Sequence, residues 1–130
     1  MSCPSVRTLA CLTLLGLLAG RAPSAHAVNL VPNDSFEIYS LCPDFLSQTN
    51  RATPWDTPTE ASPDYYNACA PGASLVSVPA NSFGNQAART GVGYMGLIAR
   101  PINDYREYIE VPLSSPLVLG QSYTVSFYWS

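Results

Sequence analysis

The chain of 130 residues contains no lysine and a single histidine, His26. Because His26 lies in an N-terminal segment that we expect to be cleaved off, the remaining chain would contain no imidazole. It therefore lacks the base of Ser-His-Asp and Cys-His nucleophiles, and also the histidine ligands of most zinc and iron sites. Catalytic chemistry in this chain would have to use carboxylates, tyrosines or arginines.

Residues 1–27 have the pattern of a cleavable signal peptide. Arg7 precedes the apolar run from Leu9 to Leu18, which at about ten residues is too short to cross a bilayer. Ala25-His26-Ala27 has the small-x-small pattern of a cleavage site. We predict export through the general secretory pathway, a mature chain that begins at Val28, and an extracellular or outer-surface location. A buried N-terminal helix is the alternative.

Charge is scarce in the predicted mature chain, and most of it is negative. Its 103 residues hold four arginines and nine carboxylates, which gives a net charge of −5. Nucleic-acid binding needs a dense basic patch, so we expect no such partner. A second apolar run of transmembrane length is also missing, so we expect no transmembrane segment in the mature chain.

Only two cysteines, Cys42 and Cys69, remain after the signal peptide. An even pair in an exported chain predicts a disulfide, here closing a loop of about 28 residues. A redox or metal-thiolate pair is disfavoured because the two residues are far apart in sequence and have no companion ligands.

The mature chain has two parts of different composition. The first, residues 28–74, begins with an apolar strand and continues through a segment, 40–74, that contains five prolines. Because each proline removes an amide donor, that segment predicts neither a long helix nor a central strand. We expect an ordered loop held by the disulfide, with its aromatic side chains packed against a sheet: Phe45, Trp55, Tyr65 and Tyr66.

The second part, residues 75–130, has the two-residue period of β-strands. We expect strands over 75–78, 93–99, 105–113 and 123–129, with a loop over 81–93. In the last of them Tyr123, Val125, Phe127 and Trp129 share one face, and Tyr128 lies on the other. This pattern predicts an all-β sandwich. An unpartnered strand of this kind invites aggregation, so we expect the domain to be truncated at Ser130 and further C-terminal domains to follow.

Two stretches resemble carbohydrate-binding jelly rolls with a galactose-binding-like fold. Asn29–Glu37 (NLVPNDSFE) resembles the N-L-x-x-N-G-x-F-E opening strand of that family, with Asp34 in place of the usual glycine. Leu117–Phe127 resembles the L-x-x-G-x-x-Y-x-x-S-F hairpin.

The chain from residue 29 to residue 130 also resembles the N-terminal module of secreted multidomain bacterial proteins, which often end in an OmpA-like or secretion-sorting domain. The shared motifs lie at Phe36–Pro43, Asp64–Cys69, Val76–Pro79, Gly91–Gly96 and Tyr105–Ile109. The resemblance implies a jelly-roll β-sandwich with a binding role and no catalysis. It also implies a structural calcium held by Glu37, for which a surface carboxylate on an edge strand is the alternative.

Sugar-binding modules present aromatic faces on which sugar rings stack, together with polar groups for the hydroxyls. The candidates in this chain are Trp55, Tyr65, Tyr66, Tyr108 and Tyr128. Tyr108 and Tyr128 lie on the polar faces of their predicted strands and are the better candidates. Aromatic side chains of a small sandwich more often fill the core, where we place Phe127 and Trp129.

The sequence thus predicts a secreted, non-catalytic binding module for carbohydrate. The alternative is a structural or adhesive module that binds a cell-surface protein. A third possibility is a glycoside hydrolase, which needs two carboxyl groups in one cleft. Glu107 and Glu110 are three residues apart and would lie on opposite faces of a strand, whereas Asp104 and Glu110 could share a face.

Overall fold

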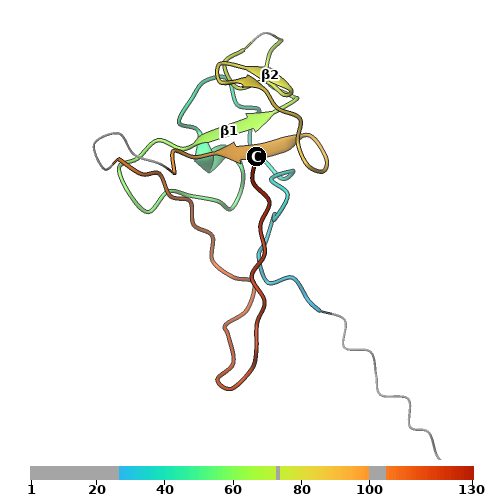
Figure 1. Ribbon diagram of the computed structural model, residues 1–130, viewed down its shortest axis with the longest axis vertical. Coiled ribbons are helices and arrows are strands. Elements are labelled where there is room, and N and C mark those ends of the chain that lie inside the picture. Colours follow the sequence, from blue (N-terminus) through green and yellow to red (C-terminus); the bar gives the residue numbers. More distant parts are fainter. Residues whose placement is uncertain (1–26, 73, 100–104) are drawn as a thin grey trace, which may run out of the picture.

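The structure is a computed structural model that describes residues 27–72, 74–99 and 105–130 (Figure 1). Residues 1–26 of the predicted signal peptide lie outside the described residues. So does Asp104, which was considered with Glu110 as a hydrolase carboxyl pair. Among the described residues there is no helix with the length and apolar character needed to cross a membrane.

Two small antiparallel sheets form the regular part of the fold. Strand β1 (Asp64–Asn67) pairs with β4 (Gly93–Gly96), so that Asp64 lies opposite Gly96 and Asn67 opposite Gly93. Strands β2 (Ala80–Asn81) and β3 (Gly84–Asn85) form a hairpin, and the single-turn 3₁₀ helix η1 covers Thr49–Arg51. The fold is β-rich, as the sequence predicts; the jelly-roll arrangement remains a prediction.

Strand β1 is covered on both faces. Tyr66 packs with Ala70 and Val76 in the apolar cluster of the core, and its ring stacks on that of Tyr94 in β4, with ring centroids 4.9 Å apart. Tyr65 is fully buried, and its hydroxyl donates to the carbonyl oxygen of Phe36 at 2.8 Å. Strand β1 therefore connects the segment around Phe36 to its partner strand β4.

The buried Asn67 at the end of β1 completes this arrangement. Its Nδ2 donates to the Tyr65 hydroxyl at 2.7 Å, and its Oδ1 accepts the backbone N–H of Cys69 at 2.9 Å. Within the described residues, no buried side-chain nitrogen or oxygen lacks a hydrogen-bond partner. An amide in the core is tolerated because each of its polar groups is satisfied.

The predicted disulfide is confirmed. Cys42 and Cys69 are bonded, with their Cα atoms 5.6 Å apart, so the bond joins the chain before η1 to the turn after β1. The disulfide thus links two segments that are 27 residues apart in sequence.

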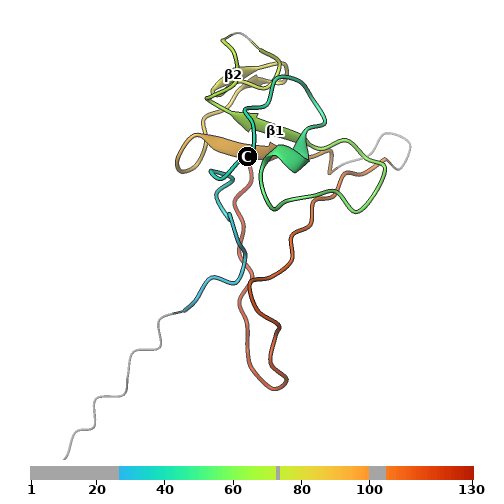
Figure 2. The same ribbon diagram turned by 180° about the vertical axis from the view of Figure 1, so that it is seen from behind.

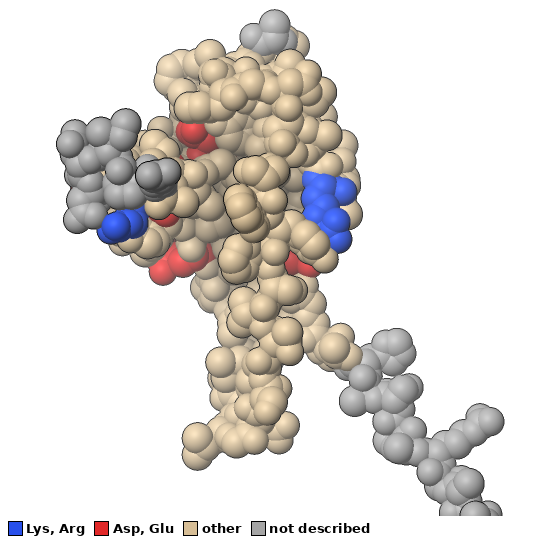
Figure 3. Space-filling model, in the orientation of Figure 1, with Lys and Arg blue, Asp and Glu red and all other residues tan. Residues whose placement is uncertain are grey.

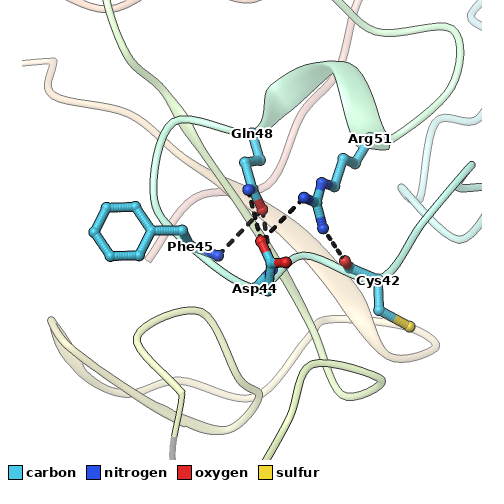
Figure 4. A network of polar contacts seen from close by, with 5 residues as sticks. All are labelled: Cys42, Asp44, Phe45, Gln48 and Arg51. Atoms are coloured by element: carbon cyan, nitrogen blue, oxygen red, sulfur yellow. Dashed lines mark hydrogen bonds and ion pairs between the residues drawn. The ribbon is translucent and has the colours of Figure 1, made fainter.

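A polar network surrounds the loop next to Cys42 (Figure 4). Arg51 forms an ion pair with Asp44 at 3.0 Å and donates to the carbonyl oxygen of Cys42. The Gln48 side chain accepts the backbone N–H groups of Asp44 and Phe45 and donates back to the Asp44 carboxylate at 2.7 Å. These contacts give the proline-rich loop a defined shape, as the sequence predicts.

Part of the proline-rich segment nevertheless forms a strand, which corrects the prediction of a continuous loop. Strand β1 begins directly after Pro63 and contains no proline of its own, so no ladder hydrogen bond is lost. The β2–β3 hairpin begins at Ala80, one residue before the predicted 81–93 loop, and otherwise lies within that loop.

The structure forms no strand in three of the segments for which we predicted one. Residues 75–78 form turns, in which the Val76 carbonyl accepts the N–H of Asn67 at 3.1 Å. Residues 105–113 contribute a single antiparallel bridge, between Glu110 and Asp56. Residues 123–129 are extended but join no ladder in the described part of the chain.

Residues 111–130, here called the arm, run out from the body of the protein and return to it (Figures 1 and 2). The arm contains no charged residue, and the projecting part in Figure 3 is uniformly tan. Phe127 and Trp129 are 79% and 87% exposed, so the prediction that they lie in the core is wrong. Side chains on a strand become buried only when another layer packs on them, and no other described segment covers this face of the arm.

Contacts near its start and near its end anchor the arm to the body. Near its start, Ser114 donates its backbone N–H to the carbonyl oxygen of Leu30 at 2.9 Å. Near its end, the guanidinium of Arg89 lies 3.2 Å from the centroid of the Tyr128 ring, a cation–π contact.

Candidate functional site

A pocket of about 340 Å³ opens where β1 begins and β4 ends. Five separate stretches of the chain build it, and the β1–β4 pairing brings Asp64 beside Gly96 and the following residues. Its lining residues are Leu46, Ser47, Ser62, Asp64, Tyr66, Phe83, Gly96, Leu97, Ile98 and Glu107. Two carboxylates, several hydroxyl groups and an exposed aromatic ring therefore meet in one place.

Asp64 is positioned by neutral donors from two elements. Its Oδ1 accepts the backbone N–H of Ser47 at 2.7 Å, and its Oδ2 accepts the Tyr66 hydroxyl at 3.1 Å. The left-handed backbone of Ser47 (φ 62°) lies at this contact. A carboxylate has about four acceptor positions, so each oxygen can take a further donor from a ligand.

Glu107 approaches the same pocket from the segment after β4. Its Oε2 accepts the backbone N–H of Ile98 at 2.8 Å, while its backbone N–H donates to the Ile98 carbonyl. Its Oε1 accepts the hydroxyl of Tyr105 at 3.2 Å and that of Ser62 at 3.3 Å. Only 9% of Glu107 is exposed, and its orientation is set by three donors.

The two carboxylates influence one another electrostatically. Burial raises the pKa of Asp64 above its ordinary value, the donors from Ser47 and Tyr66 oppose that rise, and the negative charge of Glu107 adds to it. Burial, followed by the nearby charge of Asp64, raises the pKa of the Tyr66 hydroxyl. The pocket therefore disfavours further negative charge.

An apolar rim completes the pocket. Phe83 occupies the β2–β3 turn and is 71% exposed. The turn is tied to β4 because Asn81 donates to the Tyr94 hydroxyl at 2.7 Å and also accepts the N–H of Phe83. The aromatic ring is thus presented by a hairpin whose own side chains fix it to the core.

A second pocket, of about 300 Å³, lies behind the same hairpin. Serine, leucine, alanine and asparagine line it: Ser74, Leu75, Ala80, Asn81 and Ser82. It contains no ionisable side chain, so it offers less chemistry than the Asp64–Glu107 pocket.

Two of the predicted ligand-binding aromatics belong to the core. Tyr65 is 0% exposed and Tyr66 is 3% exposed. Their rings present no open stacking face, because β1 is covered on both sides, and ligand binding by these two residues stays a prediction. Tyr66 nevertheless lines part of the pocket. There its hydroxyl donates to Asp64, while its ring stacks on Tyr94.

The other three predicted aromatics are placed apart from the pocket lining. Trp55 is half-buried, donates from Nε1 to the Asn33 carbonyl at 2.9 Å and packs on Phe36. Tyr108 is about half exposed, and Tyr128 lies on the arm against Arg89. Among the described lining residues Tyr66 is thus the only member of the predicted set.

The predicted calcium ligand, Glu37, contacts backbone amides. Its Oε1 accepts the N–H groups of Val92 and Gly93, both at 2.9 Å. A Cβ at Gly91, which has φ +63°, would overlap this carboxylate, so glycine is required there on two counts. Within the described residues no group of three or more His, Cys, Asp or Glu side chains is arranged to hold a metal ion. Calcium at Glu37 stays a prediction.

The turn before Glu37 contains Asp34, where the family pattern usually has glycine. Asn33 and Phe36 adopt the left-handed backbone, with φ 48° and 60°, and Asp34 does not. Asn33 holds the turn by accepting the N–H of Ile38 at 2.9 Å and donating to the carbonyls of Ile38 and Thr53. The chain therefore makes its turn without glycine at position 34.

Sequence reasoning considered Glu107 only with Glu110, and it missed Asp64. Glu110 is exposed and lies at the bridge to Asp56, away from the lining of the pocket. A signal for Glu107 was present, since it shares an alternating face with Ile109 and Val111. A carboxylate on an apolar face indicates burial with partners. No local signal could have paired it with Asp64.

Comparisons with known proteins add no identification. No protein-family model matches the chain, and neither a search of curated proteins nor one of solved structures found a significant match.

Proposed function

We propose that this chain is a non-catalytic carbohydrate-binding module of a secreted or cell-surface protein, with a galactose-binding-like jelly-roll fold. The observation that carries the proposal is the pocket in which Asp64, Glu107 and Ser62 lie together with the exposed ring of Phe83. The disulfide between Cys42 and Cys69 supports export, because such bonds persist in oxidising compartments.

The chemistry of the pocket suits a sugar. Carboxylates oriented by protein donors accept hydrogen bonds from vicinal hydroxyl groups, and these charge-assisted bonds are the strong ones. The ring of Phe83 offers an apolar face for the C–H groups of a pyranose. A volume of about 340 Å³ falls at the lower end of the range for small-ligand sites.

A role in binding fits the way the carboxylates are held. Glu107 is fixed by three protein donors, and both oxygens of Asp64 are engaged as well. Groups that are locked in this way orient a ligand at little cost in entropy. The proposal therefore assigns them to recognition and assigns no bond cleavage to this pocket.

A structural calcium at Glu37 belongs to the proposal as a separate element. Since Oε1 is the oxygen that contacts the amides of Val92 and Gly93, a calcium ion would have to use Oε2. Calcium takes six to eight oxygen ligands, so backbone carbonyls or water would supply most of its shell.

The arm favours a second candidate function, adhesion to a cell-surface protein. It is uncharged over residues 111–130 and exposes large apolar side chains, including Leu119, Val125, Phe127 and Trp129. Contiguous exposed apolar surface of this kind marks interaction sites.

A glycan array probed with the purified mature chain, with and without calcium, tests the proposal. We expect binding of at least one glycan class, and loss of that binding in Phe83→Ala. Phe45→Ala is the matched control, because Phe45 is 60% exposed and lies outside the pocket lining. A folded protein that binds no glycan overturns the proposal and favours adhesion through the arm.

A further inference from the structure

We propose that the ligand of the Asp64–Glu107 pocket is a cationic amino sugar, that is, a saccharide with a free protonated amine. This inference rests on the proposed carbohydrate-binding function and specifies its substrate class. The inference is based on a pocket that has an aromatic rim and two carboxylates, whose described protein partners are all neutral.

The described partners of both carboxylates are neutral. Asp64 receives an amide N–H and a phenol hydroxyl, and Glu107 receives an amide N–H, a phenol hydroxyl and a serine hydroxyl. None of the described residues that line the pocket is basic. The described contacts therefore leave the negative charge of the pocket available to a cation brought by a ligand.

The described part of the chain supplies few cations. The sequence contains no lysine. Of the three arginines that the structure describes, Arg51 is paired with Asp44, Arg89 lies over the Tyr128 ring, and Arg106 also has an interaction partner. None of the three is among the described residues that line the pocket.

Because the carboxylates are partly or largely buried, the pocket favours a cationic ligand over an anionic one. Glu107 is 91% covered, and burial together with the charge of Glu107 raises the pKa of Asp64. An ammonium group placed between the two carboxylates would relieve their repulsion and form charge-assisted hydrogen bonds. A uronic or sialic acid would add a third negative charge and would be repelled.

The aromatic rim distinguishes an amino sugar from a simple cation. Phe83, with Leu97 and Ile98 also in the lining, offers an apolar surface that a metal ion or small inorganic cation cannot use. A sugar ring stacks on such a surface, and a nearby ammonium gains a cation–π contribution. The pocket thus matches one ligand that carries both an apolar ring face and a positive charge.

The test is calorimetric titration of the intact mature chain with three tetrasaccharides at a pH that keeps the amine protonated. They are a glucosamine oligomer, its N-acetylated counterpart and a neutral glucose oligomer. We expect the glucosamine oligomer to bind at least about tenfold more tightly than either of the others, the gain of one strong charged contact. Spermine serves as a cation without a sugar ring.

Three variants locate the effect. Asp64→Asn and Glu107→Gln keep the shape of each side chain and remove its charge, so the preference for the amine should fall while binding of the neutral oligomer persists. Glu60→Gln is the matched control, because Glu60 is exposed and lies outside the pocket lining. Unfolding midpoints of all three show whether each variant is folded.

The outcomes separate this inference from the proposed function. Equal binding of the charged and neutral oligomers overturns the inference and leaves the carbohydrate-binding function standing. Binding of none of the saccharides overturns both. Spermine binding as tight as the glucosamine oligomer overturns the inference as well, because the pocket would then select charge alone.

Discussion

The carboxylate of Glu37 accepts a hydrogen bond from the backbone N–H of Gly93 at 2.9 Å, across 56 residues of sequence. The neighbouring N–H of Val92 reaches the same oxygen. This contact fastens the segment around Glu37 to the start of β4, and Gly91 leaves the space for it. It gives Glu37 a role in the stability of the fold, whether or not a calcium ion is bound.

Replacement of Glu37 should therefore weaken the fold. We expect Glu37→Ala to lower the free energy of unfolding by about 1.5–3 kcal/mol, the range for hydrogen bonds to a charged group. Glu37→Gln keeps an acceptor oxygen and should lose less. Urea unfolding in calcium and in chelator measures both effects. If the Glu37→Ala loss appears only when calcium is present, the contact with the amides is not what stabilises the protein.

The disulfide should contribute more than any single hydrogen bond. Joint replacement of Cys42 and Cys69 by serine is expected to cost about 3–4 kcal/mol, the chain-entropy value for a loop of this length. Guanidinium unfolding of the variant, compared with the oxidised and reduced wild type, measures this cost. Unchanged stability on reduction would contradict the prediction.

The stack of Tyr66 on Tyr94 should be central to the core. Tyr66→Ala removes a 97%-covered ring and is expected to cost about 3–5 kcal/mol, whereas Tyr66→Phe keeps the ring and should cost much less. Gly96→Ala should also destabilise, because its Cβ would lie 2.7 Å from the Tyr66 ring. Thermal unfolding of the three variants ranks them. If Tyr66→Phe loses as much stability as Tyr66→Ala, the hydroxyl and not the ring makes the main contribution to stability.

The raised pKa of Asp64 predicts a pH dependence with a definite sign. A carboxyl whose pKa is higher in the folded protein holds its proton more tightly there, so folding is favoured at low pH. This contribution declines as the pH rises from the ordinary value of 3.8 through the raised value, and is then absent. Asn at position 64 imitates the protonated form and does not titrate.

The stability of Asp64→Asn relative to the wild type should accordingly increase across that pH window and level off above it. Subtracting the two unfolding curves cancels the carboxyl groups that do not interact with Asp64. Glu60→Gln provides the control, which should show no such rise. A difference between Asp64→Asn and the wild type that is constant with pH would show that the pKa of Asp64 is the same in the folded and unfolded chain.

The cation–π contact between Arg89 and Tyr128 should hold the end of the arm to the body. Arg89→Gln removes the cation, and we expect lower backbone ¹⁵N order parameters over residues 121–130 with little change in global stability, because exposed contacts of this type contribute about 0.5–1 kcal/mol. Tyr128→Phe keeps a ring and should give the order parameters of the wild type. Order parameters unaltered by Arg89→Gln would show that other contacts hold the arm.

Several of the sequence motifs quoted for the resemblance have structural explanations in this chain. In the Asp64–Cys69 motif, the aspartate binds the Ser47 amide, both tyrosines are buried, the asparagine accepts the Cys69 amide and the cysteine forms the disulfide. The motif of Tyr105–Ile109 supplies the Glu107 carboxylate and the hydroxyl that contacts it. These motifs were visible in the sequence, but their roles in packing were not.

Local chemistry, which the sequence determines by itself, set several features of this protein. The two cysteines that follow the predicted signal peptide predict a disulfide, prolines predict an ordered loop, and turn residues with short apolar runs predict a β-rich fold. The buried or exposed state of a side chain depends instead on what packs against it. Tertiary contacts buried Tyr65 and left Trp129 exposed. They also brought Asp64 and Glu107 into one pocket, because antiparallel pairing of β1 with β4 joins segments that no sequence period connects.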